Sequence, residues 1–558
     1  MSAELLLISA ALAIAAPMML YKGWQRLVLS RGKHRSLAGH ARIAKRIAGL
    51  IPGYSYGPQR FFAVDDAPPA IQDRRRAGFR WLAQALGQRA PFTLAQTAEL
   101  REGLSDLQFT ARYRVPFQFS DMARAHLPMG ALWARADGVT LTDLDGTQYW
   151  DLTGSYGVNL FGVDFYKRCM AEGLAMGNEL GPVLGGYHPC VLDNVRRLRN
   201  LSGMDEVSFH MSGTEAVMQA VRLARFHSGK RHLVRFAGAY HGWWEDVQPG
   251  PGNPLPPRET YTLADLSDKA LAVLESRRDI ACVLVNPLQA LHPNRNAPGD
   301  STLVDGLRSA GFDRAAYAQW LRKLRDVCTR RGIALILDEV FLGFRLAPGG
   351  AQAYFGVQAD LVTYGKTVGG GFPVGVVCAK APWMRRFKPE RPGDICFARG
   401  TFNAHPAVMG AMNVFLRELE TAPIQALYRD ADARWLVQCD RFNAALAAAD
   451  LPMRAEAMGT VWTLTFQRPS RYHWLLQFYL REAGLALSWV GTGRFIFTLA
   501  HTDAEMAAIT SAFVGAAQRF EADGWGWQPP EISNGDAARQ LRRGVLREVL
   551  AQRWKTGR

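Results

Sequence analysis

The strongest constraint on the fold is a series of short apolar runs that each end in a polar or glycine-containing loop. Between Gly181 and His405 these runs read HLVRFAG, ACVLVNP, IALILDEV and DLVTYG, and stretches of helical periodicity separate them. Such alternation predicts an α/β fold in which helices wrap a mostly parallel sheet. The ligand site of such a sheet lies at the carboxyl ends of its strands, so residues that follow these runs are the first candidates for chemistry.

The chain has 558 residues, which is too long for one core, and we divide it into six segments. We expect an apolar helix with a basic stretch in 1–50, a linker and helical region in 51–119, part of a small domain with its pocket in 120–180, the large domain in 181–405, the rest of a small α+β domain in 406–522, and a basic helix in 523–558. The small domain would open with a hairpin at Gly138–Leu152, because Asp145-Gly146 is a tight-turn signal between alternating apolar positions. Residues 51–66 are rich in Pro, Gly, Tyr and Phe, which indicates a linker or a segment lying on a surface.

Basic residues exceed acidic ones by 66 to 50, a net charge of +16, which fits nucleic acid, an anionic membrane or anionic substrates as partner. The distribution favours a membrane, because a basic stretch without acidic residues directly follows the uncharged apolar run Leu5–Tyr21. Its basic residues are Lys22, Arg26, Arg31, Lys33, Arg35, Arg42, Lys45 and Arg46. We expect no nucleic-acid partner, since basic residues concentrate at the two ends of the chain.

Leu5–Tyr21 has three competing interpretations: a membrane anchor, a cleaved secretory signal, and a core or peripheral helix. Its length is at the short limit for a span, and Tyr21 and Trp24 would sit at the interface. Glu4 is the only charged side chain before the run, which is unlike a signal peptide, although Ala13-Ile14-Ala15 could mimic a cleavage site. We expect the anchor, with the body of the protein on the cytoplasmic face of a membrane, because the positive charge follows the run.

Two further features concern the surroundings of the protein. Seven cysteines are scattered singly, without CxxC or CxxH spacing, which predicts a reducing compartment and no zinc site. Asp536–Arg558 is a candidate basic amphipathic helix, with Leu541, Val545, Val549 and Trp554 near one face. Membrane contact and packing on the body are both open for this helix.

Lys366 and Asp338 follow two of the apolar runs and suit an aldehyde cofactor with a basic ring nitrogen. A lysine amine can capture an aldehyde where glycines allow close approach, and Lys366 lies in the segment YGKTVGGG. A carboxylate at a buried strand end can keep the ring nitrogen protonated, and Asp338 closes IALILD. Val340 would point to the same side and pack on the ring. A surface lysine in a turn and a helix-capping aspartate are the alternatives.

A phosphate group is best held by backbone amides and a hydroxyl at a helix N-terminus. Ser212, Gly213 and Thr214 precede the helical run VMQAVRLARFHSG and supply both, although ordinary capping would use the same residues. Thr401, in GTFN, is a second hydroxyl candidate. Tyr240, in Tyr240-His241-Gly242, offers an aromatic ring to stack on a pyridine face.

The motifs SGTEA, YHG, NPLQ, LDEVFLGFR, YGKTVGGGFPVG, GTFNAHP and FTLAHTDAEM occur in this order over about Gly138 to Phe520. In order and spacing they resemble the class III aminotransferases of fold type I, and within that family the branch of the glutamate-1-semialdehyde aminomutases. The resemblance implies pyridoxal 5′-phosphate as cofactor, a homodimer with shared active sites, and small-molecule amine donors and carbonyl acceptors as partners.

The resemblance also implies roles for single residues. Lys366 would form the Schiff base and Asp338 would hold the ring nitrogen, while Val340 and Tyr240 would lie on the two ring faces. The other implied cofactor contacts are Ser212, Gly213, Thr214, His241, Gln289 and, from the neighbouring subunit, Thr401. Ser155 and Tyr156 match a pair that lines the substrate pocket of the family.

Two positions depart from the pattern of the family. Asn286-Pro287 stands where relatives usually have Glu-Pro, which removes one acidic group. Gln118, in Val115-Pro116-Phe117-Gln118, matches the arginine that binds a substrate carboxylate in the aminomutase. Glutamine loses the charge-assisted, bidentate contact that arginine makes with a carboxylate.

We therefore expect transamination to an aldehyde or ketone, with an apolar acceptor, through Lys366. The lost arginine, the anchor and the aromatic residues Phe117, Phe119, Tyr156, Trp243 and Trp489 favour this substrate class, although core packing is an ordinary fate of such aromatics. The alternatives are the glutamate-1-semialdehyde 2,1-aminomutase reaction and a non-catalytic membrane-associated scaffold. A scaffold would have no need for a buried charged constellation.

Overall fold

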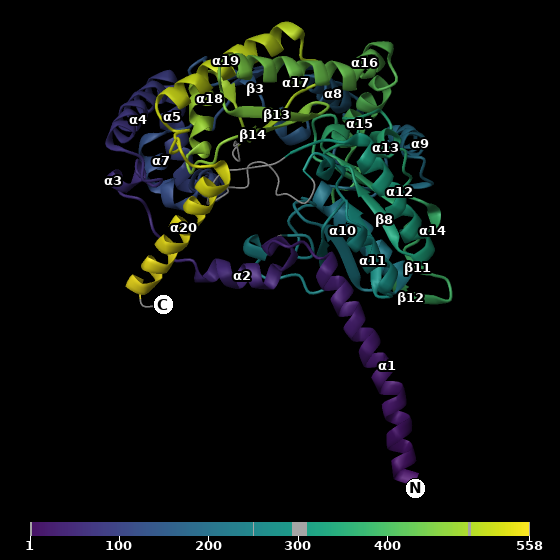
Figure 1. The fold of residues 1–558 in the computed structure, drawn as a ribbon. Coiled ribbons are helices and arrows are strands. Elements are labelled where there is room, and N and C mark those ends of the chain that lie inside the picture. The colour runs from purple at the N-terminus through teal and green to yellow at the C-terminus, as the bar shows by residue number, and fades with distance from the viewer. Residues whose placement is uncertain (1–2, 249, 293–309, 489–492, 557–558) are drawn as a thin grey trace.

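The computed structural model describes residues 3–248, 250–292, 310–488 and 493–556, with side chains from residue 15 to residue 554 (Figure 1). The large domain contains a seven-stranded sheet in the order β4-β10-β9-β8-β7-β5-β6. The four predicted strands are present and pair in parallel: β5 (His232–Phe236), β7 (Ile280–Val285), β8 (Ala334–Asp338) and β9 (Leu361–Gly365). The predicted mostly parallel α/β sheet is confirmed.

Three strands of this sheet were not predicted: β4 (Glu206–His210), β6 (Thr260–Leu263) and β10 (Gly375–Ala379). β6 pairs in parallel with β5, whereas β10 runs antiparallel to both β4 and β9. β4 was missed because its residues alternate between polar and apolar over only five positions, too short a run to separate from a loop.

Helices cover both faces of the sheet, which explains why its central strands are continuously apolar. α10 (Gly213–Ser228) packs on one face, against alternate residues such as Leu284 and Ile336. α12 (Arg314–Arg331) packs on the other face with Leu335 and Leu337. All residues of β7, β8 and β9 are buried, so the polar groups at their ends are held on a rigid frame.

The small domain combines chain segments from before and after the large domain. The predicted hairpin is present as β2 and β3, and Gly146 in its turn has φ of 81°. β15, far along the chain, pairs with β3, and a second sheet has the order β13-β14-β16. The bounds are β1 Arg135–Asp137, β2 Thr140–Thr142, β3 Gln148–Asp151, β13 Met453–Met458, β14 Val461–Phe466, β15 Leu485–Ala486 and β16 Arg494–Ile496. α17 (Ala431–Ala448) and α19 (Asp503–Ala522) lie over this domain.

Residues 67–119 are helical as predicted, but residues 51–66 are not a loose linker. The helices are α4 (Pro69–Arg89), α5 (Pro91–Gly103) and α6 (Ser105–Tyr113). In the preceding segment Phe61, Phe62 and Val64 are buried in the core, and Asp65 pairs at 2.7 Å with the fully buried Arg75. The phenylalanines of this segment, which suggested a segment lying on a surface, are instead packed in the core.

The N-terminal helix α1 (Ala3–Gly32) leaves the body at one end of the molecule (Figure 1). Its second half is attached to α11 (Asp268–Ser276), where Tyr21 Oη and Gln25 Nε2 donate to the carbonyl oxygen of Ser276. Among the helices that the structure describes, none is long and apolar enough to cross a membrane.

The C-terminal helix α20 (Asn534–Thr556) is present and is fastened to residues 54–60 through Glu548. The Glu548 carboxylate accepts hydrogen bonds from Tyr56 Oη at 2.5 Å and from Arg60 at 2.9 Å, and it pairs with Arg471 at 3.2 Å. Leu541, Val545 and Val549 are half-buried, whereas Trp554 is 86% exposed. The prediction that these four residues share one apolar face was therefore wrong. The body of the protein packs only against the side of α20 that carries Glu548, and Trp554 lies away from that side.

We expect Glu548→Gln to lower the free energy of unfolding by about 3 kcal/mol, because it leaves the buried Arg471 guanidinium without its carboxylate. Burial works to raise the pKa of Glu548, and the hydrogen bonds from Tyr56 and Arg60 outweigh it, so the pKa lies below its usual range. This contribution is present above the unfolded pKa and is lost as pH falls through the lower folded pKa. Urea unfolding of Asp536→Asn, an exposed ion pair on the same helix, is the control and should change by less than about 1 kcal/mol.

Candidate active site

His241 and Asp338 form a buried pair at the carboxyl ends of their strands. The two groups come from the loop after β5 and from the last residue of β8, and His241 Nδ1 lies 2.7 Å from Asp338 Oδ2. Burial lowers the pKa of His241 although Asp338 opposes the shift. This shift favours the neutral imidazole, whose Nδ1–H can donate to Asp338 Oδ2 and so fix the direction of the carboxylate. Asp338 Oδ1 also accepts from the backbone N–H of Val340 at 3.1 Å.

Lys366 directly follows β9 in a left-handed conformation, with φ of 50°. Its Nζ donates to the Tyr156 carbonyl oxygen at 2.5 Å and lies 4.7 Å from the centre of the Phe341 ring. Burial lowers the pKa of Lys366 to about 8; Asp338 opposes this shift, and Arg345 and Arg494 add to it. A lysine with this pKa is partly neutral at physiological pH, as a nucleophilic amine must be.

Ser212, Gly213 and Thr214 stand at the N-terminus of α10 as predicted. Ser212 Oγ caps the helix by accepting from the N–H of Glu215 at 3.2 Å, so the capping alternative also holds for this side chain. The N–H groups of Gly213 and Thr214 are the first two of the helix and have no carbonyl partner within it. A Cβ on Gly213 would lie 2.5 Å from Val340 Cγ1, so only glycine lets the amides come this close to Val340.

The other predicted site residues differ in their surroundings. Ser155 and Tyr156 form a strained turn, with φ of 46° and 56°. The backbone carbonyl oxygen of Tyr156 accepts the hydrogen bond from Lys366 Nζ. Such backbone strain persists only where the surrounding structure enforces it. Gln289 is buried and donates to the carbonyl of Ala237. Tyr240 and Thr401 are both exposed in the single chain, Tyr240 by 62%.

Gln118 and several of the aromatic candidates have other neighbours. Gln118 is buried, and its Nε2 lies 3.4 Å from Tyr54 Oη, so its place in a substrate pocket stays a prediction. Phe119 is fully buried against Tyr56 and belongs to the core. Trp243 is 74% exposed, and Trp489 lies outside the described residues.

Asn286 explains one departure from the family pattern. Its Nδ2 donates to the carbonyl oxygen of Tyr240 at 2.9 Å, and its Oδ1 accepts from the N–H of Leu288 at 3.1 Å. A glutamate has no hydrogen to donate when ionised, so an amide at this position holds the Tyr240 loop in a way that a carboxylate would not.

We expect Asn286→Asp to lower kcat/KM about tenfold, because it removes the donor to the Tyr240 carbonyl and leaves two buried acceptors facing each other. Steady-state kinetics and thermal unfolding would be measured together. Asn443→Asp removes a similar 2.9 Å bond, to Ala455 in the small domain, and should lower stability alone. Equal effects of the two variants on kcat/KM would contradict the assignment.

Two arginines near Lys366 were missed by sequence reasoning. Arg345 is fully enclosed and binds the carbonyl oxygens of Phe497 at 2.8 Å and Asn159 at 3.1 Å, which joins the two domains beside the site. Arg494, at the start of β16, lies 6.0 Å from the centre of the Phe341 ring. The end of the motif LDEVFLGFR contains Arg345, but its partners come from far along the chain and leave no local signal.

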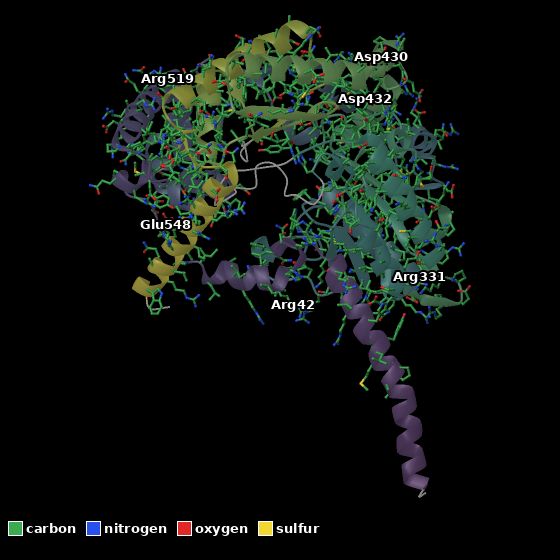
Figure 2. All side chains as sticks on the ribbon, viewed as in Figure 1. Arg42, Arg331, Asp430, Asp432, Arg519 and Glu548 are labelled. Atoms are coloured by element: carbon green, nitrogen blue, oxygen red, sulfur yellow. The ribbon has the colours of Figure 1, made fainter. Side chains whose placement is uncertain are left out.

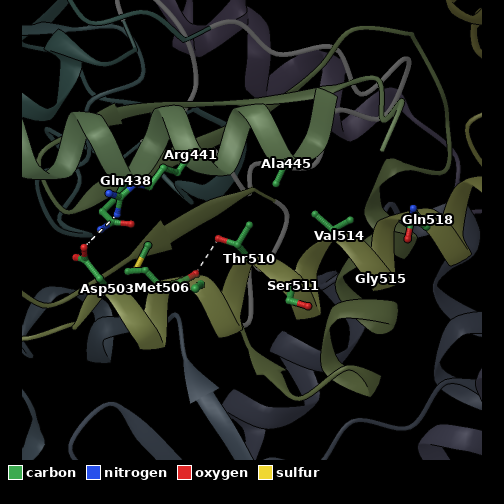
Figure 3. A pocket seen from close by; sticks show the side chains of 11 residues that line it. Gln438, Arg441, Ala445, Asp503, Met506, Thr510, Ser511, Val514, Gly515 and Gln518 are labelled. Atoms are coloured by element: carbon green, nitrogen blue, oxygen red, sulfur yellow. Dashed lines mark hydrogen bonds and ion pairs between the residues drawn. The ribbon is translucent and has the colours of Figure 1, made fainter. Parts of the chain in front are cut away.

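A groove lies elsewhere, between α17 and α19, with a cavity volume of about 530 Å³ (Figure 3). In this groove the side chain of Gln438 donates to the Asp503 carboxylate at 2.7 Å, and Thr510 Oγ1 donates to the backbone carbonyl oxygen of Met506. None of its lining residues was predicted to carry chemistry, and the groove is not the candidate active site.

Residues 121–516 match the family described as aminotransferase class-III. The chain is 32% identical over 410 residues to a glutamate-1-semialdehyde 2,1-aminomutase of Nitratidesulfovibrio vulgaris, covering 68% of this chain and 89% of the relative. A solved transaminase with PLP bound superposes with a TM-score of 0.58 at 25% identity, covering 71% of this chain and 92% of its own. A β-phenylalanine aminotransferase from Variovorax paradoxus has the same fold, with a TM-score of 0.64 at 24% identity over 81% of this chain and 98% of its own.

The chain therefore belongs to the class III aminotransferase family and is a pyridoxal-phosphate-dependent enzyme of amino-group transfer. The residues present fit this cofactor. The helix amides suit its phosphate, and Gly213 leaves room for Val340, which would pack on its ring. The carboxylate fixed by His241 suits its ring nitrogen, and the lowered pKa of Lys366 suits its aldehyde.

Proposed function

We propose that this enzyme transfers an amino group from a donor amine to an apolar aldehyde or ketone. The observation that carries the substrate class is the aromatic ring of Phe341, which lies 4.7 Å from Lys366 Nζ, beside the strained turn of Tyr156. Gln118 in place of the carboxylate-binding arginine of the family supports the same class, because it offers no charge to an acid substrate.

The geometry of the site supports a proposed role for each of its residues. When bound, the cofactor supplies the aldehyde that captures the amine and a ring that accepts the electron pair released at the substrate carbon. Lys366 moves the proton at that carbon, since its lowered pKa allows it to take up and return a proton near neutral pH. Asp338 would hold the proton on the ring nitrogen, and His241 is a positioning residue for Asp338. Tyr240 and Val340 would lie on the two faces of the ring.

The aminomutase reaction is the second candidate function. Four curated relatives at 31–33% identity carry that name, and Arg494 beside Lys366 could meet a substrate carboxylate. In that case one molecule would both give and receive the amine.

The experiment that separates the candidates starts from the full-length enzyme in its pyridoxamine form. Recovery of the aldehyde-form absorbance would be followed as carbonyl compounds are added. We expect faster recovery with long-chain aldehydes or ketones than with short dicarboxylates. Recovery with glutamate semialdehyde, together with formation of 5-aminolevulinate, would instead assign the aminomutase reaction.

We further propose a homodimer in which Thr401 reaches the phosphate bound by the partner. Large aromatic side chains near the site are exposed in the single chain, including Tyr240 at 62%, Trp243 at 74% and Phe402 at 49%. A second copy would cover them, as obligate interfaces do. Sedimentation of the holoenzyme as a monomer at micromolar concentration would contradict this assembly.

Membrane attachment through the N-terminal segment, on the cytoplasmic face, is a separate proposal. The outer part of α1 exposes Met18, Met19 and Leu20, which are 54–75% exposed and precede the basic stretch, and Trp24 within that stretch is 50% exposed. Truncation before Lys22 should reduce recovery of the protein with membranes. Unchanged recovery would reject α1 as the principal anchor.

A further inference from the structure

The helix α2 (Ala41–Leu50) turns its small residues toward the body and its large apolar residues toward solvent. Ala44 is buried, and a Cβ on Gly250 in η4 (Gly250–Gly252) would lie 2.3 Å from the carbonyl oxygen of Ala41. Ile43, Ile47 and Leu50, which share one face, are 50%, 38% and 52% exposed. A helix packed on a globular body ordinarily buries its apolar stripe, so the orientation of α2 is the reverse of the usual one.

The charged residues of α2 are all basic. Arg42 and Arg46 are exposed beside it, and Lys45 reaches back to the carbonyl oxygen of Pro251 at 3.5 Å. The sequence has no acidic residue between Glu4 and Asp65. An exposed apolar stripe beside exposed arginines is complementary to a surface that presents hydrocarbon beneath negative charge.

The C-terminal end of α20 repeats this pattern on the same side of the molecule, where α1 also leaves the body (Figures 1 and 2). Glu548 faces the body, whereas Leu546, Leu550 and Trp554 are 59%, 47% and 86% exposed. The exposed arginines Arg543 and Arg547 lie among these apolar residues. Tryptophan is favoured at membrane interfaces.

We propose that α2 lies flat on an anionic bilayer, with Ile43, Ile47 and Leu50 between the lipid chains and Arg42 and Arg46 at the headgroups. The end of α20 contacts the same surface. This inference goes beyond amine transfer and does not depend on whether α1 crosses the bilayer. It orients the whole body on the membrane, since α2 is packed directly against η4 of the large domain.

A fluorescent label on α2 tests the proposal even if α1 holds the protein on the membrane. All seven native cysteines are buried, so Ile47→Cys in the full chain can be labelled selectively with an environment-sensitive dye. With vesicles of phosphatidylcholine and phosphatidylserine, we expect a blue shift and quenching by a lipid-borne spin label. The control is Leu436→Cys, on an exposed position of α17, whose dye should stay in water. An α2 dye that behaves like the α17 dye would overturn the proposal.

A second measurement follows vesicle affinity. The variant Ile43→Gln with Leu50→Gln should weaken binding to the anionic vesicles about tenfold or more, because two apolar side chains no longer enter the bilayer. The matched control, Leu436→Gln with Val437→Gln, should bind as the wild type does. Amine transfer should persist in both variants. The proposal would be rejected if the α2 variant bound vesicles as tightly as the wild type. It would also be rejected if the α2 variant lost self-association while its vesicle binding stayed the same, because the stripe would then contact a second copy of the chain.

Discussion

Replacing Lys366 with alanine should lower amine transfer by about a thousandfold or more. The substitution removes the amine that meets the cofactor aldehyde and the group that moves the substrate proton. The fold should survive, because the Lys366 side chain is half-buried and its amine donates to the backbone carbonyl oxygen of Tyr156. Single-turnover rates and the visible spectrum of the bound cofactor would be compared with those of the wild type.

Lys380→Ala is the matched control for this loss. Lys380 follows β10 just as Lys366 follows β9, but its Nζ donates to the carbonyl oxygen of Gly203 at 2.6 Å and pairs with Asp205. Its removal should leave turnover unchanged. Comparable rates in Lys366→Ala and Lys380→Ala would assign the chemistry to another residue.

The pKa of Lys366 also predicts a pH profile. The lysine must be neutral to capture the cofactor aldehyde, so the capture rate of the cofactor-free chain should rise with pH and level off above about 8. A lysine at the ordinary value of 10.5 would give a rate that still increases beyond that point. Stopped-flow absorbance over this range would distinguish the two profiles.

Asp338→Asn should lower kcat by about a hundredfold or more, as the loss of one preorganised electrostatic partner does in other sites. Asparagine keeps the size of the side chain but cannot hold a positive charge on the ring nitrogen, and it weakens the 2.7 Å bond to His241. Cofactor affinity and kcat would be measured separately, because the electrostatic role acts on kcat.

Asp360→Asn provides the control for charge removal at the same sheet. Asp360 precedes β9 at its opposite end and pairs with Arg325 at 2.8 Å. This variant should lose stability and keep its turnover. An unchanged kcat in Asp338→Asn would show that the carboxylate is structural, like that of Asp360.

The sequence predicted those parts of the fold that depend on local pattern. The apolar runs of β5, β7, β8 and β9 are uninterrupted because both faces are covered, and polar residues mark the ends of these strands. Since parallel strands bring their carboxyl ends to one edge, Asp338, Tyr240 and Lys366 could be predicted to share a site. The hairpin at Asp145-Gly146 could also be predicted, because its turn signal lies within the few residues that form the turn.

Features that depend on distant contacts could not be predicted in the same way. The aromatics of residues 51–66 are suitable for either a surface or a core, and only packing beside Arg75 and Trp474 decides between them. The positive charges of Arg345 and Arg494 help to lower the pKa of Lys366, but these two arginines lie far from each other in the sequence. The exposure of Ile43 could not be predicted either, because the pattern of α2 alone would favour burial of its stripe.

The most direct test of amine transfer uses the full-length enzyme loaded with pyridoxamine phosphate that carries an isotope-labelled nitrogen. A long-chain aldehyde is added in a single turnover, and the products are examined by mass spectrometry. We predict that the labelled nitrogen appears in a new long-chain amine while the aldehyde form of the cofactor is recovered. Label that stays on the cofactor with the long-chain aldehyde and with every other carbonyl compound offered would contradict amine transfer as the function of this site.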